Sequence, residues 1–147
     1  MSVSTASLVM PLTAVVADDH SFTRQTLCSL LPAYNVEVVG TADDGTGVLP
    51  LLQEHGPTLL VLDLSMPNRS GLDVLQDLKA LADEGTPAVD HVIVFSMEHN
   101  QAYVDAAFRL GADAFVLKGH DAAELGHAIE AVRNGETYVS EAIASSS

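Results

Sequence analysis

The sequence predicts one α/β domain, a doubly wound (βα)5 sandwich in which helices cover both faces of a parallel sheet. Two observations predict this fold class. Short apolar runs alternate five times with segments of helical spacing, and strict alternation of strand and helix implies parallel pairing. The runs at 59–62 and 92–95 are apolar throughout, as expected for strands covered on both faces. A chain of 147 residues is long enough to bury the core of such a domain.

Five runs have the length of strands and are rich in Val, Leu, Ile or Ala. In chain order they are Thr13–Ala17, Val36–Val39, Leu59–Leu62, Val92–Phe95 and Ala114–Leu117. A charged residue, Glu37, interrupts the second run, which predicts that this strand lies at one edge of the sheet.

Apolar residues between these runs recur at the spacing of a helix face. The clear examples are Leu27, Leu30, Leu31 and Tyr34; Val74, Leu75, Leu78 and Leu81; Tyr103, Ala106, Ala107 and Leu110; and Leu125, Ala128, Ile129 and Val132. The second helix is weaker, because Gly47 and Pro50 fall at its start, and we expect it to begin only near Pro50. Residues typical of helix ends flank these segments. Ser70 precedes one helix, Gly111 follows another, and Asp121 with Glu124 forms a capping pair at the start of the last.

Composition excludes several classes of partner. Twenty acidic residues against six basic ones give a formal net charge of −14. The basic residues are scattered along the chain: Arg24, Arg69, Lys79, Arg109, Lys118 and Arg133. A chain of this kind lacks the basic surface that binds DNA, RNA or an anionic membrane. We therefore expect neither nucleic acid nor membrane among its partners.

The single cysteine, Cys28, excludes an internal disulfide and favours a reducing compartment. No apolar run approaches the ~20 residues of a membrane helix, and the N-terminus lacks the basic segment of a signal peptide. We expect a soluble, cytoplasmic protein whose folded domain spans residues 11–136. The Ser- and Ala-rich ends are expected to be an N-terminal tail, 1–10, and a C-terminal tail or the start of an interdomain linker, 137–147.

The residues that directly follow the strands carry the chemical information. Asp18 and Asp19 follow the first strand, Asp63 the third and Lys118 the fifth, and Ser96 follows the fourth. The carboxyl ends of parallel strands lie along one edge of a sheet, where ligands bind, so these side chains should converge. Crowded carboxylates repel one another unless a cation holds them, and oxygen ligands with open positions suit Mg²⁺. The sequence therefore predicts a Mg²⁺ site beside a hydroxyl and an ammonium group.

This set of groups fits phosphoryl transfer, which needs a positioned nucleophile and positive charge near the transferred oxygens. Asp63 can be the attacking carboxylate, Mg²⁺ and Lys118 can neutralise developing charge, and Ser96 can donate a hydrogen bond. Each residue alone has a simpler interpretation, as a solvated aspartate, a surface lysine or a helix-capping serine. Their occurrence together, after buried strands, favours the chemical interpretation.

Four ordered motifs surround these positions. They are Val15-Val16-Ala17-Asp18-Asp19-His20, then Leu62-Asp63-Leu64-Ser65-Met66-Pro67 with Gly71, then Val94-Phe95-Ser96, and finally Arg109-Leu110-Gly111-Ala112-Asp113-Ala114-Phe115-Val116-Leu117-Lys118. Together they resemble the receiver domain of two-component response regulators, most closely the nitrate-response (NarL/LuxR) class. The resemblance covers about residues 12–140.

The resemblance implies a flavodoxin-like fold with strand order 2-1-3-4-5. It implies that Asp63 accepts a phosphoryl group from a sensor histidine kinase, and that the domain is not a conventional enzyme. Asp19 and Asp63 would ligate Mg²⁺ directly, together with the backbone carbonyl of Ser65, while Asp18 would act largely through water. The expected responses are a phosphorylation-dependent homodimer and control of a DNA-binding domain of the helix-turn-helix type that this chain lacks.

The resemblance also implies that Ser96 and Lys118 bind the phosphoryl group, and that Phe115 is the switch aromatic, turning inward when Ser96 moves. Two positions depart from the family pattern. Gly119 stands where many receivers have a cis-proline, and Met97 stands where a smaller residue is common. We expect Met97 to narrow access to the phosphoacceptor. Neither departure removes a chemical group from the site.

Other functions fit less well. A Mg²⁺-dependent phosphohydrolase with an aspartyl nucleophile usually carries D-x-D after its first strand, whereas Asp19 is followed by His20 and Ser21. A zinc site is disfavoured because no pair among His20, His99, His120 and His127 has a metal-ligand spacing. A degenerate module that takes no phosphate conflicts with the complete set of groups. A natural stand-alone receiver, acting through protein–protein contact or as a phosphate relay, stays open as the alternative.

Overall fold

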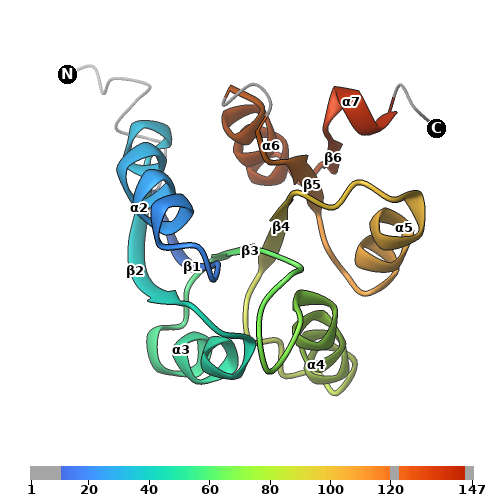
Figure 1. The fold of residues 1–147 in the computed structure, drawn as a ribbon. Helices are drawn as coiled ribbons and strands as arrows, with labels where there is room; N and C mark the ends of the chain where they lie inside the picture. Colours follow the sequence, from blue (N-terminus) through green and yellow to red (C-terminus); the bar gives the residue numbers. More distant parts are fainter. Residues whose placement is uncertain (1–10, 120–122, 145–147) are drawn as a thin grey trace.

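The computed structural model describes residues 11–119 and 123–144, which form a six-stranded sheet between two layers of helices (Figure 1). The strand order is β2-β1-β3-β4-β5-β6, and the pairs that the structure describes are all parallel. The strands are β1 (Leu12–Ala17), β2 (Val36–Ala42), β3 (Leu59–Leu62), β4 (His91–Ser96), β5 (Ala114–Leu117) and β6 (Tyr138–Val139). This order confirms the flavodoxin-like arrangement and adds a short sixth strand. Strand β2 lies at one edge, as its internal charge predicted.

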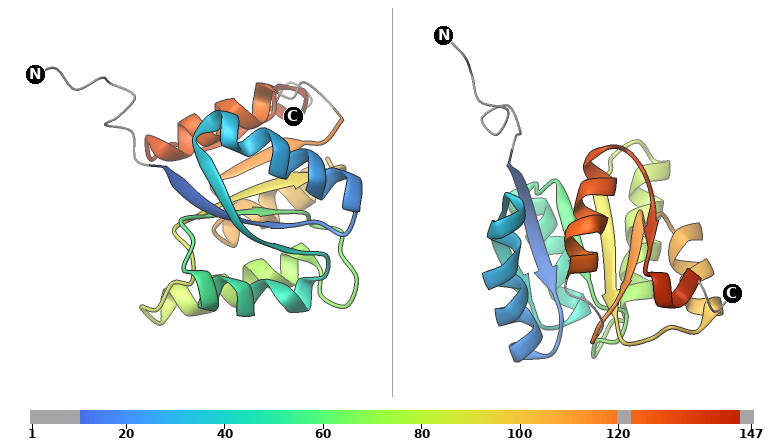
Figure 2. Two further views of the ribbon diagram at one scale, coloured as in Figure 1. Left: turned by 90° about the vertical axis from the view of Figure 1, so that its left-hand side faces the viewer. Right: turned by 90° about the horizontal axis from the view of Figure 1, so that it is seen from above.

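The helices are divided between the two faces of the sheet. One face is covered by α3 (Val48–His55), α4 (Gly71–Asp83) and α5 (Gln101–Arg109), and the other by α2 (Ser21–Leu30) and α6 (Ala123–Arg133). The side view in Figure 2 shows the sheet between these two layers. Two short 3-10 helices, η1 (Leu31–Tyr34) and η2 (Gly45–Gly47), and a short helix α7 (Glu141–Ala144) complete the described elements. None of these helices is both long and apolar enough to cross a membrane.

Each face of the sheet has its own buried apolar cluster, because successive strand residues point to opposite sides. Val15 of β1 packs on the side of α3, α4 and α5, whereas its neighbours Ala14 and Val16 pack on the side of α2 and α6. All four residues of β3 and all four of β5 are buried. The central strands are therefore held by packing on both faces. This packing also fixes the position of the residues at their carboxyl ends.

Helix α3 begins at Val48, so the expected start near Pro50 was wrong. The 3-10 helix η2 leads directly into it, and Asp44 caps η2 by accepting a hydrogen bond from the Thr46 amide at 2.7 Å. Pro50 lies in the first turn of α3, where amide groups have no partner within the helix. Proline at this position therefore removes no helical hydrogen bond and does not delay the helix.

Two of the predicted helix signals are confirmed. The Ser70 side chain accepts a hydrogen bond from the Asp73 amide at 3.2 Å, and the Asp73 carboxylate accepts one from the Ser70 amide at 3.3 Å. Gly111, just after α5, has a φ of +104°, a backbone conformation that favours glycine. Asp121, the expected cap of the last helix, lies outside the described residues.

The C-terminal segment contributes two elements that we had not expected in a tail or linker. Strand β6 pairs in parallel with β5, and α7 follows it, with Ile143 only 2% exposed. The folded part of the chain thus reaches beyond the expected boundary at residue 136. We call residues 138–144 the C-terminal strap.

Candidate functional site

The carboxyl edge of the sheet brings together four of the predicted side chains. Asp18 follows β1, Asp63 follows β3, Ser96 ends β4 and Lys118 follows β5. Their exposed fractions are 1%, 2%, 1% and 8%, respectively. Buried polar and charged groups are stable only when they have partners, so a cluster of four at one point of the sheet indicates a site and not a chance arrangement.

Lys118 is the cation at the centre of this cluster. Its Nζ lies 2.6 Å from Asp18 Oδ2 and 3.1 Å from Asp63 Oδ2, and it also lies 6.0 Å from the centroid of the Phe95 ring. The contact with Asp63 is a hydrogen bond as well as an ion pair. Asp18 Oδ2 has the ion pair with Lys118 but no partner in hydrogen-bond geometry among the described residues. One ammonium group is thus shared by two buried carboxylates.

Asp19 lies at the open side of the cluster, with 32% of its side chain exposed. His20, which we had set aside as a metal ligand, lies beside it: its Nδ1 is 3.0 Å from Asp19 Oδ1 and 3.4 Å from Asp18 Oδ1. One ligand atom each from Asp18, Asp19, His20 and Asp63 lies within 4.8 Å of the others. The sequence did not reveal that His20 lies beside these carboxylates, because its position relative to Asp63 depends on the pairing of separate strands and not on spacing to another histidine.

The charges of the site favour a divalent cation. Asp18, Asp19 and Asp63 carry three negative charges when ionised and Lys118 carries one positive charge, which leaves two negative charges uncompensated. Burial raises the pKa of the Asp63 carboxyl, and the neighbouring Asp18 charge adds to this; Lys118 and a hydrogen bond from the Ser65 amide oppose it. The close approach of ligand atoms from Asp18, Asp19 and Asp63 and the raised pKa of Asp63 both fit a cation held between the carboxylates, with oxygen ligands of the kind Mg²⁺ prefers.

Backbone contacts fix the position of the carboxylates. The Ser65 amide donates to Asp63 Oδ1 at 3.2 Å, and Arg24 Nη1 donates to the carbonyl oxygen of Asp18 at 2.7 Å. Helix α4 begins against the end of β3, so that a Cβ on Gly71 would lie 2.4 Å from the Asp63 carbonyl oxygen. Glycine is required at this point because the helix approaches the main chain of the acidic residue so closely.

Ser96 does not cap helix α5, although a serine at such a position often does. Its Oγ accepts a hydrogen bond from the Glu98 amide at 3.0 Å, while the cap of α5 is Asn100, whose side chain accepts from the Ala102 amide at 2.8 Å. The Ser96 hydroxyl therefore belongs to the loop beside the buried carboxylates. Phe115, the predicted switch residue, is fully buried in the cluster on the side of α3, α4 and α5.

An apolar hollow of about 430 Å³ lies next to the buried groups and includes Lys118 in its lining. Phe22 and Met97 line it with 78% and 66% of their surface exposed, which is unusual for large apolar side chains. Met97 thus lies near the site, as expected, but it is turned largely toward solvent.

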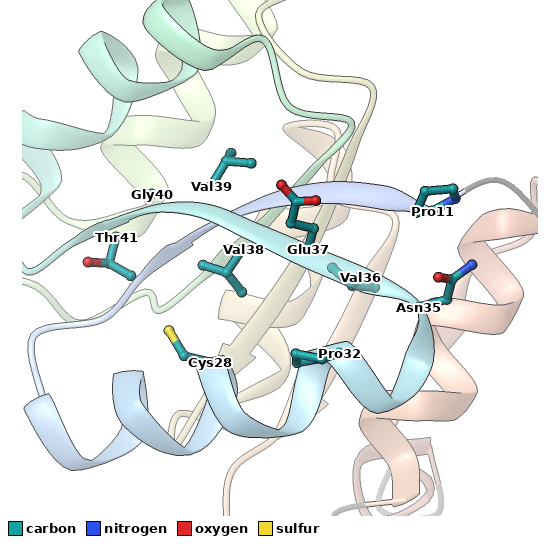
Figure 3. A pocket seen from close by; sticks show the side chains of 10 residues that line it. All are labelled: Pro11, Cys28, Pro32, Asn35, Val36, Glu37, Val38, Val39, Gly40 and Thr41. Atoms are coloured by element: carbon teal, nitrogen blue, oxygen red, sulfur yellow. The ribbon is translucent and has the colours of Figure 1, made fainter.

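A larger hollow, of about 710 Å³, lies elsewhere, along the edge strand β2 (Figure 3). Cys28 of α2 and Pro32 of η1 line one side of it, and Glu37 and Val38 of β2 line the other. None of the clustered carboxylates or Lys118 contributes to its lining. The size of a hollow therefore does not identify the chemical site in this protein.

The sequence is similar to known signalling proteins. The family model of the response regulator receiver domain matches residues 14–130. The nitrate/nitrite response regulator protein NarL of Escherichia coli (strain K12) is 32% identical over 134 residues, which are 90% of this chain and 60% of NarL. The oxygen regulatory protein NreC of Staphylococcus haemolyticus is 34% identical over 127 residues, 85% of this chain and 56% of NreC. The chain thus spans 60% or less of the length of these two relatives.

Solved structures agree with the sequence comparison. A LuxR-family two-component response regulator from Aurantimonas sp. SI85-9A1 has a TM-score of 0.82 and 29% identity, covering 92% of this chain and 94% of that one. The signal receiver domain of NarL from Mycobacterium tuberculosis has a TM-score of 0.75 and 31% identity, covering 87% and 100%. The isolated REC domain of RcsB from Salmonella enterica serovar Typhimurium, determined with the phosphomimetic BeF3⁻, has a TM-score of 0.75 and 26% identity, covering 91% and 96%.

Proposed function

This chain belongs to the response regulator receiver domain family of two-component systems, and on that premise we propose that Asp63 accepts a phosphoryl group from a sensor histidine kinase in a Mg²⁺-dependent reaction in the cytoplasm. The domain is a signalling module and not a conventional enzyme. The negative charge of the added phosphoryl group changes the surface of the domain. The changed surface controls self-association or, in a longer chain, a DNA-binding output domain.

The observation that carries this proposal is the position of Asp63. The carboxylate is 2% exposed at the end of a buried strand, and its Oδ2 lies 3.1 Å from Lys118 Nζ. In the proposed step one Asp63 oxygen forms a bond to phosphorus, and the bond from phosphorus to the donor atom breaks, with the electron pair leaving on the donor. Lys118 offers positive charge, and the Ser96 hydroxyl a hydrogen bond, to the transferred oxygens.

We propose the metal ligands that the resemblance to the receiver family implies. Asp19 and Asp63 would hold Mg²⁺ directly with the backbone carbonyl of Ser65, and bound Mg²⁺ would neutralise charge on the phosphoryl oxygens. Asp18 Oδ2 already pairs with Lys118 at 2.6 Å, which supports a role for Asp18 through water. Few protein ligands and several retained waters are usual for this ion.

Phosphorylation would act on the surroundings of Lys118 and Ser96. A phosphoryl group adds roughly 1.5–2 negative charges, and both residues would reorient toward it. We propose Phe115, which is fully buried in this structure, as the aromatic residue that responds when Ser96 moves. A phosphorylation-dependent homodimer is the readout that we propose for this chain.

The test is labelling with acetyl phosphate. We expect one acid-labile phosphoryl group per chain in the presence of Mg²⁺, measured by intact-mass spectrometry, and none when EDTA removes the metal. Asp63→Asn should abolish labelling, because an amide is a poor nucleophile for phosphorus. Asp83→Asn, at an exposed aspartate on α4, is the matched control and should label like the unchanged protein. Undiminished labelling of Asp63→Asn would refute the assignment.

A further inference from the structure

The geometry of the C-terminal strap points to a role in the reaction. We propose that the strap, through Ser140, positions Lys118 opposite Asp63, and that phosphoryl binding at Asp63 in turn stabilises the strap. Ser140 is a positioning residue in this proposal, because it acts through β5 and touches no reacting atom. This inference rests on the proposed phosphorylation of Asp63. It adds a path of contacts through which a phosphoryl group at Asp63 affects the C-terminal strap.

Ser140 is bonded to the strand that carries Lys118. It is fully buried, its amide donates to the Phe115 carbonyl at 2.9 Å, and its Oγ accepts from the Leu117 amide at 2.8 Å. Leu117 directly precedes Lys118, whose own amide donates to the Ser96 carbonyl at 2.8 Å. The end of β5 is therefore held from β4 on one side and from the strap on the other, one residue from the lysine of the site.

The direction of the Ser140 side chain is informative. Ser140 directly precedes α7, a position where a serine oxygen often caps the helix. Here the Oγ instead accepts from the Leu117 amide, and the first amide of α7, that of Glu141, donates to Glu124 Oε1 at 3.0 Å. The Glu124 carboxylate of α6 thus accepts the hydrogen bond from the first amide of α7. The Ser140 hydroxyl oxygen accepts one from β5 instead.

Two further contacts hold the strap against the body of the domain. The Tyr138 hydroxyl donates to the same Glu124 oxygen at 2.8 Å, so one carboxylate, 8% exposed, bonds to both β6 and α7. Ile143 of α7, 2% exposed, packs in the same apolar cluster as Phe115 and Ala107. The strap therefore shares an apolar cluster with the predicted switch residue and is also hydrogen-bonded to its backbone.

Docking of the strap should strengthen phosphoryl binding, because it reduces the conformational freedom of Lys118 before binding. A phosphoryl group binds best when Lys118 is already held in place, because less freedom is then lost on binding. A docked strap restricts the end of β5 before the ligand arrives. Coupling between two sites is reciprocal, so a ligand at Asp63 must stabilise the docked strap by the same factor. Loosening the strap should weaken phosphoryl binding without removing any group from the site.

The experiment uses residues 1–147, with beryllofluoride and Mg²⁺ as the probe for a bound phosphoryl group. NMR titration measures its affinity, and hydrogen exchange measures protection of the Leu117 amide. We expect beryllofluoride to slow exchange at Leu117, and Ser140→Ala to weaken beryllofluoride binding by about fivefold or more, the lower end of typical coupling. Tyr138→Phe, which leaves the β5 hydrogen bonds in place, should act in the same direction with a smaller effect and serves if Ser140→Ala does not fold.

Thr13→Val is the matched control. It also removes a hydroxyl that accepts a backbone hydrogen bond, from the Thr58 amide at 3.2 Å, but at the opposite end of the sheet. The Thr58 amide also donates to the Thr13 carbonyl at 3.0 Å and keeps that partner in the variant, which should leave beryllofluoride affinity unchanged. Equal weakening by Thr13→Val, or unchanged binding in the strap variants, would overturn the positioning role. Beryllofluoride binding without a change at Leu117 would overturn this inference alone, whereas the absence of any binding to the unchanged chain would overturn the proposed function with it.

Discussion

Asp63 carries its negative charge in a place where only 2% of the residue's surface meets solvent. Burial disfavours the ionised form more than Lys118 and the Ser65 amide favour it, so the pKa of Asp63 is raised above its ordinary value of 3.8. Burial of the ionised Asp63 carboxylate therefore lowers the free energy of unfolding slightly. Binding of a cation, or protonation of the side chain, would remove this cost.

We expect Asp63→Asn to raise the melting temperature by a few degrees at pH 7 in EDTA, because the variant buries no charge there. The folded state binds the Asp63 proton more tightly than the unfolded chain does. The stability that this proton provides is present below pH 3.8 and is lost as the pH rises through the raised pKa of the fold. The advantage of the variant should therefore shrink in acid.

Thermal unfolding of both proteins across the pH range measures this difference. Asp83→Asn, at a largely exposed aspartate, should melt close to the unchanged protein. An Asp63→Asn protein that is less stable than the unchanged chain at pH 7 would show that Lys118 and the Ser65 amide outweigh burial.

Among the elements, the contact between the end of β3 and the start of α4 bears directly on the site. A Cβ at Gly71 would lie 2.4 Å from the Asp63 carbonyl oxygen and 2.6 Å from Leu64 Cα, and both obstacles are backbone atoms that cannot rotate away. The capping pair of Ser70 and Asp73 fixes the first turn of α4 at the same point. The helix start and the phosphoacceptor strand therefore form one closely packed unit.

Gly71→Ala should lower the free energy of unfolding by about 1–3 kcal/mol, the usual cost of overpacking. It should also slow labelling by acetyl phosphate, since relief of the clash must move the backbone of Asp63. Urea denaturation measures the first effect. The control is Gly47→Ala, whose added Cβ would meet only Ala42 Cβ, at an ordinary 3.7 Å. If both variants have the same stability, the close approach of α4 is not a constraint.

At the scale of the whole molecule, charge limits what this chain can bind. The net charge is −14, and its six basic residues lie among the described residues. Five of them already interact with oxygens of the chain itself: Arg24, Arg69, Lys79, Lys118 and Arg133. Little positive surface is left to neutralise a row of phosphates, which is the main source of DNA affinity.

We therefore predict no saturable DNA binding by residues 1–147, with or without beryllofluoride, in a mobility-shift assay at low salt. A basic DNA-binding domain of similar size in the same gel is the control. Light scattering on the same samples should instead show any self-association that beryllofluoride induces. A salt-sensitive, saturable shift would contradict the interpretation of this chain as a regulatory module that binds proteins.

The sequence by itself determined the sheet, its parallel pairing and the residues at its carboxyl edge. Apolar runs define buried strands such as β3, and the alternation with helices places Asp18, Asp63 and Lys118 at one edge. Local signals also located the start of α4, because a capping box depends on residues close in sequence. These features follow from periodicity and from neighbours along the chain.

Only the tertiary structure decided how the groups of the site pair and how the C-terminal strap packs. The sharing of Lys118 by two carboxylates, and the position of His20 beside them, depend on side chains brought together from separate strands. The two residues of β6 are too few to show a period, and β6 exists because β5 offered an unpaired edge. Ser140 likewise looks like a helix cap until the fold brings the Leu117 amide to it. Contacts between residues far apart in sequence leave no local pattern, so they are visible only once the chain has folded.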